Sequence, residues 1–421
     1  MAKSNQQVII IGGGHVGLSF ALLLAHHGVA STVLERVQYP TVSPDEDHER
    51  QQYLDSRNTA LSRRTVQIYQ EIGLWDSLQS HACRIDGVRI SEQGSFGRAS
   101  LDKAAEGVES FGQVMENAWL GRQLLQAVRA NPLVNVLDGA LVKDITQTET
   151  TASVVFERQN HDTAQSIQSV QTLSSPLVVA CDGQHSVART LLGVGAMVHD
   201  YHQTGIVGVV ETAKPHQHLA IERFTEQGLL AVLPLTDGIK DTDNHAGSCR
   251  RSVVWICQKG EEGRYLTDDA YFLQVLGETF GAEAGQFVKA GRRGAYPLAK
   301  VLADRQVVGR VVLMGNAAHT LHPVAGQGFN LCMRDAYAMA KILANAQQHS
   351  IDFGNSDKLT HYEQSRQKDQ KRVIAFCDTV VHSFTHKNPF VKFGRNLGLL
   401  AFDKIPFVKP LVASYAMGLK S

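Results

Sequence analysis

Residues 8–25 read VIIIGGGHVGLSFALLLA, and this stretch decides the fold of the chain. It begins with a β-branched run that suits a strand buried on both faces. Three glycines in GxGxxG spacing then open an apolar helix: Gly12, Gly14 and Gly17. A second apolar run, TVLE, follows at residues 32–35. This order predicts a buried βαβ unit, and the central glycines weaken the alternatives of a signal peptide or a membrane-spanning helix.

Each glycine has its own physical role in a dinucleotide site. Gly12 permits the tight turn, Gly14 lets the backbone approach a pyrophosphate, and Gly17 lets the helix pack closely on the sheet. The helix N-terminus offers unpaired N–H groups to the anion. Glu35 ends the second strand at the spacing of a ribose-binding carboxylate. Arg36 beside it is either a contact to a 2′-phosphate or a solvated side chain, and the motif leaves NAD and FAD both open.

Two further motifs follow in order along the chain. Residues 177–189 read LVVACDGQHSVAR, a buried strand followed by a polar turn. Residues 311–334 read VVLMGNAAHTLHPVAGQGFNLCMR, a strand, a Gly-rich loop and a helix from about Phe329. The three motifs together resemble those of the FAD-dependent aromatic hydroxylases of the p-hydroxybenzoate hydroxylase superfamily. Within it, the last motif is most similar to the ubiquinone-biosynthesis ring hydroxylases, in particular those that act on 2-octaprenyl-6-methoxyphenol.

The resemblance implies FAD as the cofactor and assigns roles to single residues. Gly315 and Asn316 match the positions at the ribityl or ribose hydroxyls, where most relatives carry an aspartate in place of the asparagine. A neutral acceptor gives a hydrogen bond of about 1 kcal/mol against about 1.5–3 for an ionised one, so we expect somewhat weaker FAD binding. Arg57 matches the arginine that approaches the flavin, and Asp182 the aspartate near cofactor and reductant. Ala118 replaces an arginine found in many relatives, which puts any FAD contact there in doubt.

The Gly-rich loop is expected to carry the chemistry. Its flavin-ring residues are Pro323, Gly326, Gln327 and Gly328. Reduction leaves negative charge on the flavin, and N–H groups at the following helix N-terminus can stabilise it. Gly326, Gly328 and Asn330 are also assigned to cofactor binding. The resemblance implies hydroxylation by O₂ through a flavin C4a-hydroperoxide. No second GxGxxG is present, which fits either NAD(P)H bound transiently or a protein electron donor, and no general base stands out.

The charges of the chain exclude one class of partner. Among 421 residues, 41 Lys and Arg balance 41 Asp and Glu, which argues against a nucleic-acid binder. Residues 387–421, however, hold six cations, one acid and interleaved aromatic residues. Such a segment suits a peripheral membrane contact. Together with the resemblance, it implies a cytoplasmic protein that associates peripherally with the inner membrane, or with a soluble ubiquinone-biosynthesis complex.

No metal site is expected from the sequence. The six cysteines form no CxxC pair, and each histidine pair lacks a third ligand at suitable spacing. The pairs are His199 and His202, His216 and His218, and His319 and His322.

The expected fold is α/β: a Rossmann-like FAD-binding domain, an antiparallel-sheet substrate domain and a helical C-terminal tail. The FAD domain is expected to be discontinuous, over residues 1–83, 113–199 and 299–350. The substrate domain comprises residues 84–112 and 200–298, and the helical region residues 351–421. In that region Val373, Phe376, Val380 and Phe384 recur at helical spacing, which favours core packing over an interfacial helix.

The resemblance implies a monooxygenase that converts 2-polyprenyl-6-methoxyphenol to 2-polyprenyl-6-methoxy-1,4-benzoquinol in ubiquinone biosynthesis. The substrate is then a polyprenylated phenol. Three alternatives stay open: another ring hydroxylase of the same pathway, a hydroxylase of a soluble aromatic compound, or a non-catalytic flavin-binding subunit of a biosynthetic complex.

Overall fold

The computed structural model describes residues 6–40, 57–95, 97–160, 167–226, 228–237 and 247–385. A six-stranded sheet forms one end of the molecule, in the order β18-β19-β12-β1-β2-β8. All its neighbouring strands pair in parallel except β18 and β19. The strands are β1 (Gln7–Ile11), β2 (Ala30–Glu35), β8 (Val134–Asp138), β12 (Leu177–Ala180), β18 (Val307–Val308) and β19 (Val311–Leu313).

The predicted βαβ unit is confirmed. Helix α1 (His15–His26) joins β1 to β2, and both strands lie in the interior of the sheet. Gly12 has φ +100°, and its N–H donates to the Leu34 carbonyl oxygen at 2.8 Å. A Cβ on Gly12 would lie 2.6 Å from the carbonyl oxygen of Cys181. The tight turn therefore requires glycine for both its conformation and its space.

Both faces of this sheet are covered. Alternate residues of β1 enter two different cores, one formed with helices and the other with a three-stranded sheet. The helices are α1, α3 (Arg63–Glu71), α5 (Asn117–Ala130), α9 (Gln327–Gln348) and the first part of α10 (Ser356–Thr385). The small sheet consists of β9 (Ala140–Gln147), β10 (Ala152–Asn160) and β11 (Ile167–Ser175).

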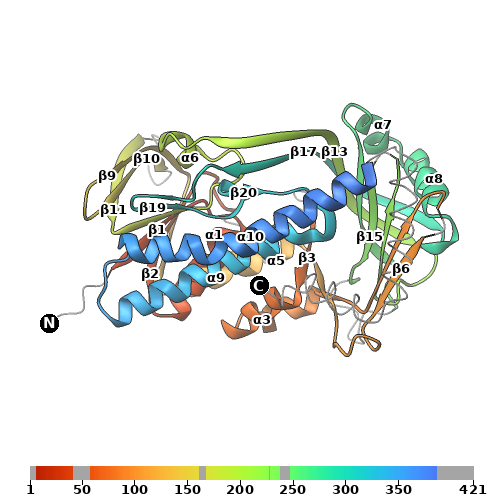
Figure 1. The fold of residues 1–421 in the computed structure, drawn as a ribbon, viewed down its shortest axis with the longest axis horizontal. Coiled ribbons are helices and arrows are strands. Elements are labelled where there is room, and N and C mark those ends of the chain that lie inside the picture. Colours follow the sequence, from red (N-terminus) through yellow and green to blue (C-terminus); the bar gives the residue numbers. More distant parts are fainter. Residues whose placement is uncertain are drawn as a thin grey trace.

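A second, eight-stranded sheet forms the other end of the molecule (Figure 1). Its order is β20-β17-β13-β16-β15-β14-β5-β6. The strands are β5 (Gly87–Glu92), β6 (Arg98–Asp102), β13 (Ala196–Thr212), β14 (Leu219–Phe224), β15 (Leu229–Pro234), β16 (Arg250–Gln258), β17 (Phe287–Ala303) and β20 (His319–Thr320). The long strands β13 and β17 run between the two ends of the molecule. The expectation of an antiparallel sheet needs one correction, because β14 pairs in parallel with β5.

A smaller group of elements lies between the two large sheets. Strands β3 (Asn58–Ser62), β7 (Gly112–Glu116) and β4 (Cys83–Ile85) form a three-stranded sheet. Beside it are α4 (Trp75–Leu78) and the 3₁₀ turn η1 (Gln79–His81). Near the edge of the six-stranded sheet, α6 (Val187–Leu191) follows β12.

Two helices that the sequence did not predict cover the outer face of the eight-stranded sheet. They are α7 (Glu262–Thr267) and α8 (Asp269–Phe280), followed by the turn η2 (Gly281–Glu283). Asp268 caps α8, since its carboxylate accepts the Tyr271 N–H at 2.9 Å. Phe272, Leu276 and Phe280 recur every four residues and are buried against the sheet. The cap and this periodicity are local signals from which α8 could have been predicted.

The predicted C-terminal helix exists as α10, and its buried face agrees only in part with the expected one. Cys377 and Val381 are buried with the partly buried Val373 and Val380, whereas Phe376 is 43% exposed. Within the described part of the chain, no helix is long and apolar enough to cross a membrane. The basic, aromatic segment 387–421 lies outside the described residues.

Gly17 has no room for an added methyl group. A Cβ there would overlap the carbonyl oxygen of Gly12. We expect Gly17→Ala to lower the unfolding free energy by about 3 kcal/mol, because neither backbone can yield easily. A melting midpoint lowered by about 5 °C or more, or loss of soluble protein, is the expected result. Gly277→Ala in α8 is the matched control, because its Cβ meets no atom within 4 Å, and it should melt at or above wild type.

Candidate functional site

Three loops meet at the carboxyl edge of the six-stranded sheet. They follow β1, β12 and β19, which are parallel, so that their ends come to the same edge. Gly12 packs against Cys181, and the position of a Cβ on Gly315 lies 3.2 Å from Cγ1 of Val16. The structure thus brings the Gly12–Gly17 turn, Asp182 and Gly315 together, although they are far apart in the sequence.

The first of these loops leaves room for an anion. Within the described residues, no atom lies within 4 Å of the Cβ position of Gly14, which is the N-cap of α1. No side chain caps this helix, so its first N–H groups are available to a phosphate. Glu35 accepts the N–H groups of Gly13 at 2.6 Å and Val37 at 2.9 Å. Arg36 is exposed, as a solvated surface arginine would be.

The second loop presents an unused acceptor. Oδ2 of Asp182 accepts the Ala188 N–H at 2.9 Å, whereas Oδ1 is buried without a hydrogen-bond partner among the described residues. A buried acceptor without a partner is costly unless a ligand completes it. The arginine of this motif has a different role. Arg189 donates to the carbonyl oxygens of Ala317 at 3.0 Å and Gln184 at 2.9 Å, and so ties the second loop to the third.

The third loop leads into the N-terminus of α9. It contains the 3₁₀ turns η3 (Gly315–Ala317) and η4 (Val324–Gly326). Pro323 precedes η4 with φ −68°, and Gly326 is the N-cap of α9 in the left-handed region, with φ +59°. Gln327 is buried, and a Cβ on Gly328 would meet no described atom within 4 Å. Since no side chain caps α9, its N–H groups can stabilise an anionic group placed at the loop.

Asn330 holds this helix in place rather than offering its amide to a ligand. Its Oδ1 accepts the Ser62 N–H and the Thr65 hydroxyl, both at 2.8 Å. Its Nδ2 donates to the carbonyl oxygens of Ala60 at 2.8 Å and Gly326 at 2.9 Å. Two donors and two acceptor positions are the full capacity of the amide. Asn330 therefore positions the Gly326 turn against β3.

Three other predicted positions lie around these loops. Asn316 is exposed at η3. The guanidinium of Arg57 is exposed and lies 5.2 Å from the ring centroid of Tyr296, on the eight-stranded sheet. Ala118 is in the first turn of α5, where its methyl group cannot replace the hydrogen bonds of an arginine.

A buried ionic cluster behind the third loop was not predicted from the sequence. Asp335 of α9 accepts His319 Nε2 at 2.7 Å and Arg366 Nε of α10 at 2.6 Å. Arg366 also pairs with Asp369, which accepts Arg334 Nε at 2.9 Å. Burial opposes the charge of His319, but the neighbouring Cys332 and Asp335 outweigh it and raise the pKa of His319 to about 10. The cluster joins the loop, α9 and α10.

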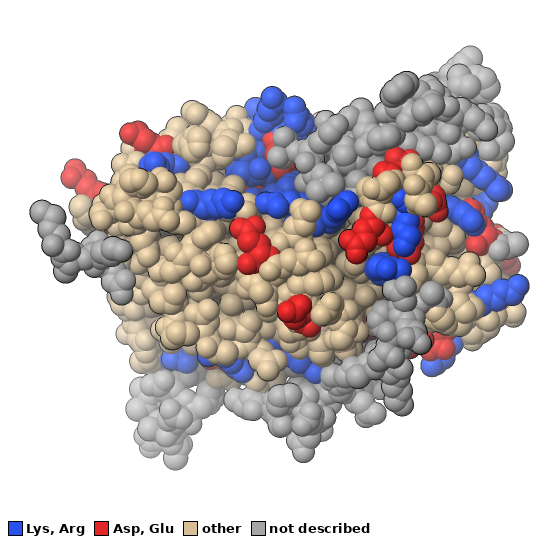
Figure 2. Space-filling view, turned by 90° about the horizontal axis from the view of Figure 1, so that it is seen from below, with Lys and Arg blue, Asp and Glu red and all other residues tan. Residues whose placement is uncertain are grey.

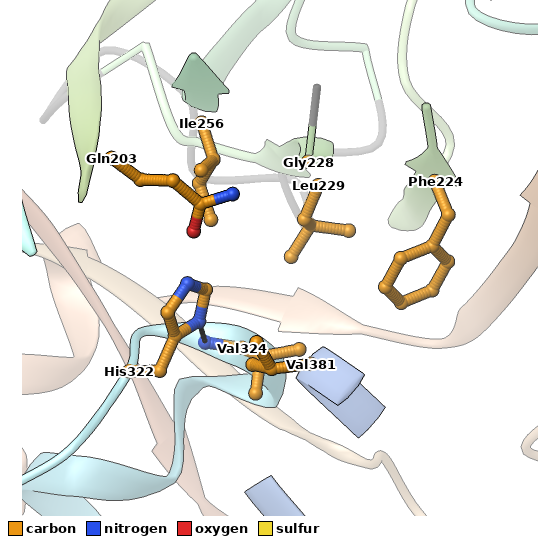
Figure 3. A pocket seen from close by; sticks show the side chains of 8 residues that line it. All are labelled: Gln203, Phe224, Gly228, Leu229, Ile256, His322, Val324 and Val381. Carbon is orange, nitrogen blue, oxygen red and sulfur yellow. Dashed lines mark hydrogen bonds between the residues drawn. The ribbon is translucent and has the colours of Figure 1, made fainter. Parts of the chain in front are cut away.

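A recess lies between the third loop, α10 and the eight-stranded sheet (Figure 3). It is narrow, with room for about one or two water molecules, and part of it is open to solvent. Its lining residues are Gln203, Phe224, Gly228, Leu229, Ile256, His322, Val324 and Val381. Nδ1 of His322 accepts the Val324 N–H at 3.3 Å, while Nε2 is buried without a partner among the described residues. Burial lowers the pKa of His322 to about 4, so that it is neutral and Nε2–H is a donor.

Cys83, His216 and His218 form the one group of metal-ligating side chains found in the described residues. The fold supplies Cys83, from β4, as the third ligand that sequence spacing did not provide. Nε2 of His216, however, donates to the Leu235 carbonyl oxygen at 2.9 Å, and its Nδ1 accepts the His218 N–H at 3.0 Å. Burial raises the pKa of Cys83 to about 12 and lowers that of His216 to about 4. These are neutral hydrogen-bonding partners, and a metal ion would have to displace the bond to Leu235 or the bond to His218.

The surface carries charges of both signs. On the face drawn in Figure 2, Lys and Arg side chains lie across the middle with Asp and Glu among them. Large parts of this face are uncharged. No field of a single sign dominates this face, in keeping with the balanced composition.

Comparison with known proteins identifies the family of this site. A family model described as "FAD binding domain" matches residues 5–377. Ubiquinone hydroxylase UbiL of Rhodospirillum rubrum is 30% identical over 99% of this chain and 90% of its own. The 3-demethoxyubiquinol 3-hydroxylase of Escherichia coli K12 is 28% identical over the whole of both chains. The crystal structure of p-nitrophenol 4-monooxygenase PnpA from Pseudomonas putida shares the fold, with a TM-score of 0.75, 19% identity and 98% of each chain covered.

Asp335 is the centre of the buried ionic cluster, and its removal tests the cluster. We expect Asp335→Asn to lower the unfolding free energy by about 3–5 kcal/mol, because His319 and Arg366 lose a buried charged partner. The melting midpoint measures this. Glu157→Gln, in a surface pair with Lys143, is the matched control and should cost at most about 1 kcal/mol. Equal midpoints for the two variants would contradict the central role of Asp335.

Proposed function

Since the chain belongs to the FAD-binding family of aromatic-ring hydroxylases, we propose that it hydroxylates the ring of a polyprenylated phenol in ubiquinone biosynthesis. The reaction proposed is the conversion of 2-polyprenyl-6-methoxyphenol to 2-polyprenyl-6-methoxy-1,4-benzoquinol. The observation that carries the proposal is similarity along essentially the whole chain to two ubiquinone-ring hydroxylases.

The residues of the site suit FAD binding. The open space above Gly14 and the uncapped N-terminus of α1 fit a pyrophosphate, and the unused Oδ1 of Asp182 fits a hydroxyl donor. Glu35 would accept from the ribose, and Gly315 and Asn316 would border the ribityl chain. The N-terminus of α9, placed by Pro323, Gly326 and Asn330, would stabilise the reduced ring. When bound, FAD supplies the electrons that activate O₂.

The reductant and the location form part of the same proposal. Electrons come from NAD(P)H or from a protein donor, since the sequence holds a single GxGxxG motif. The protein takes its lipid-like substrate while bound peripherally to a membrane surface or to a biosynthetic complex.

A neighbouring step of the same pathway is the second candidate. The relative from Escherichia coli is named for hydroxylation at position 3 of demethoxyubiquinol, and it matches this chain from end to end. The two candidates differ in the carbon that receives oxygen, and therefore in the intermediate that accumulates when the enzyme is missing.

Quinone analysis of a deletion strain separates these candidates. We expect a strain that lacks the protein to lose ubiquinone and to accumulate 2-polyprenyl-6-methoxyphenol. Complementation with the wild-type gene should restore ubiquinone. Accumulation of the demethoxy intermediate would assign the neighbouring step instead, and an unchanged quinone pool would contradict both.

Gly14→Asp tests the FAD site without disturbing the fold. The position has open space and is an N-cap, where aspartate is favourable, so we expect the variant to fold. Its carboxylate would face the pyrophosphate, and FAD affinity should fall at least a hundredfold, on the order of 3 kcal/mol. The FAD content of the purified protein and titration of the apoprotein measure this. Gly14→Asn has the same size without the charge, so it should lose affinity only through its bulk and bind FAD more tightly than Gly14→Asp. Equal FAD binding by both variants would place the pyrophosphate elsewhere.

A further inference from the structure

The inner face of the eight-stranded sheet carries a carboxylate, Glu222 of β14. Ala220 and Phe224, two residues before and after it, are both buried on this face. Ala220 packs in the cluster that contains β4 and β7, and Phe224 in the cluster that contains η4 and α10. Because side chains alternate along a strand, Glu222 points to the same side, between these two clusters.

The neighbours of Glu222 on this face are apolar. Ala231 of β15 and Ile90 of β5 lie directly opposite it in the two adjoining strands. Phe224 and Leu229, which pair one step further along, line the recess that holds His322 and Val324 (Figure 3). Successive side chains on one face of a strand are about 7 Å apart. Glu222 is therefore one step along the strand from the recess and faces the layer of the flavin-ring loop.

Glu222 is only half-buried, and its carboxylate has no hydrogen bond or ion pair with any residue that the structure describes. Burial is the cause that raises its pKa to about 7. Other titratable groups on this side are Glu92, opposite Phe224 on β5, and His322 in the recess. Tyr201 packs in the same cluster as Phe224 and contacts Asp378, which pairs with Lys300. A carboxylate kept among apolar side chains without a partner costs stability, and such groups gather where a ligand or a proton is handled.

We propose that Glu222 accepts the proton of the ring hydroxyl of the bound phenol. This inference rests on the proposed function, which supplies the phenol. The O–H bond breaks, its electron pair stays on the ring oxygen, and the proton forms a carboxylic acid with Glu222. The extra electron density on the ring favours attack on an electrophilic oxygen. The acid then returns its proton to solvent, so that the residue is unchanged after each turnover.

The apolar surroundings suit this role. A general base works best when its pKa lies near the working pH, because it is then ionised often enough and still holds a proton well. An exposed glutamate, with a pKa near 4.3, would be a weaker base. General base catalysis contributes about 10²- to 10⁴-fold to rates, which sets the size of the effect to look for.

Glu222→Gln is the direct test, because it keeps the size of the side chain and removes the base. Photoreduced, FAD-loaded enzyme is mixed with O₂ and a short-chain 2-prenyl-6-methoxyphenol, and product is measured in a single turnover. We expect product formation to slow on the order of a hundredfold or more, while the dissociation constant of the phenol changes less than threefold. Wild type should lose activity as pH falls below about 7, and the variant should lack this acid limb.

Two comparisons separate catalysis from structure. Glu222→Asp keeps a carboxylate and should recover part of the rate, while Glu211→Gln, in an exposed pair on the same sheet, should match wild type.

A ring-fluorinated substrate with a more acidic hydroxyl should reduce the deficit of Glu222→Gln at least tenfold, which a purely structural defect would not do. We expect the glutamine variant to melt no lower than wild type at pH 8, because burial opposes the charge that it removes.

The outcomes separate this inference from the function on which it rests. If wild type hydroxylates the phenol and Glu222→Gln keeps both the rate and the acid limb, the inference is wrong and the function stands. If wild type with bound FAD never hydroxylates a prenylated phenol, the proposed function is wrong, and Glu222 loses this role with it. A glutamine variant that fails to fold, together with a Glu222→Asp variant that shows no acid limb, would also overturn the inference.

Discussion

The contact between Gly17 and the backbone of Gly12 is the constraint on which the rest of the site depends. A side chain at residue 17 would overlap the Gly12 carbonyl oxygen, so α1 can begin this close to β1 only with glycine there. This brings the N-terminus of α1 to the carboxyl edge of the sheet. The loops after β12 and β19 end at the same edge because their strands are parallel to β1. One backbone contact thus helps to gather three loops that are spread over some 300 residues of the chain.

The second helix of the site, α9, is placed by polar groups in addition to its apolar packing. Asn330 uses its whole amide to join α9 to β3 and to the Gly326 turn. One turn further on, Asp335 joins the same helix to His319 and to Arg366 of α10. Because buried polar groups must be paired in specific directions, these bonds define one position of the helix N-terminus. Apolar packing alone would allow small shifts at little cost.

The sequence predicted those parts of the molecule that local patterns encode. The βαβ unit and the Gly-rich loop before α9 show in the spacing of glycines and apolar runs, and so do the strands of the second sheet. The sequence of α8 contains an N-cap residue and apolar residues at helical spacing. The β-like runs on both sides of it, however, favour strands throughout this region. The partners of His319 and His216 could not be predicted. Asp335 lies 16 residues after His319, in α9, and Cys83 lies 133 residues from His216. No local pattern encodes such pairs. The parallel pairing of β5 with β14 likewise depends on contacts between residues far apart in the sequence.

Hydrogen-bond capacity divides the buried polar groups of this protein into two kinds. The amide of Asn330 and the carboxylate of Asp335 make all their hydrogen bonds to other groups of the protein, so they need no ligand as a partner. Oδ1 of Asp182 and Nε2 of His322 are buried without partners in the described residues. The half-buried carboxylate of Glu222 has no hydrogen-bond partner among these residues either. Without a partner, the free-energy cost of removing such groups from water is not offset in the folded protein. They lie at the edge of the sheet, in the recess and on the face opposite the ring loop. These are the places where bound molecules can supply the missing partners, which is the physical reason to assign function to them rather than to the engaged groups.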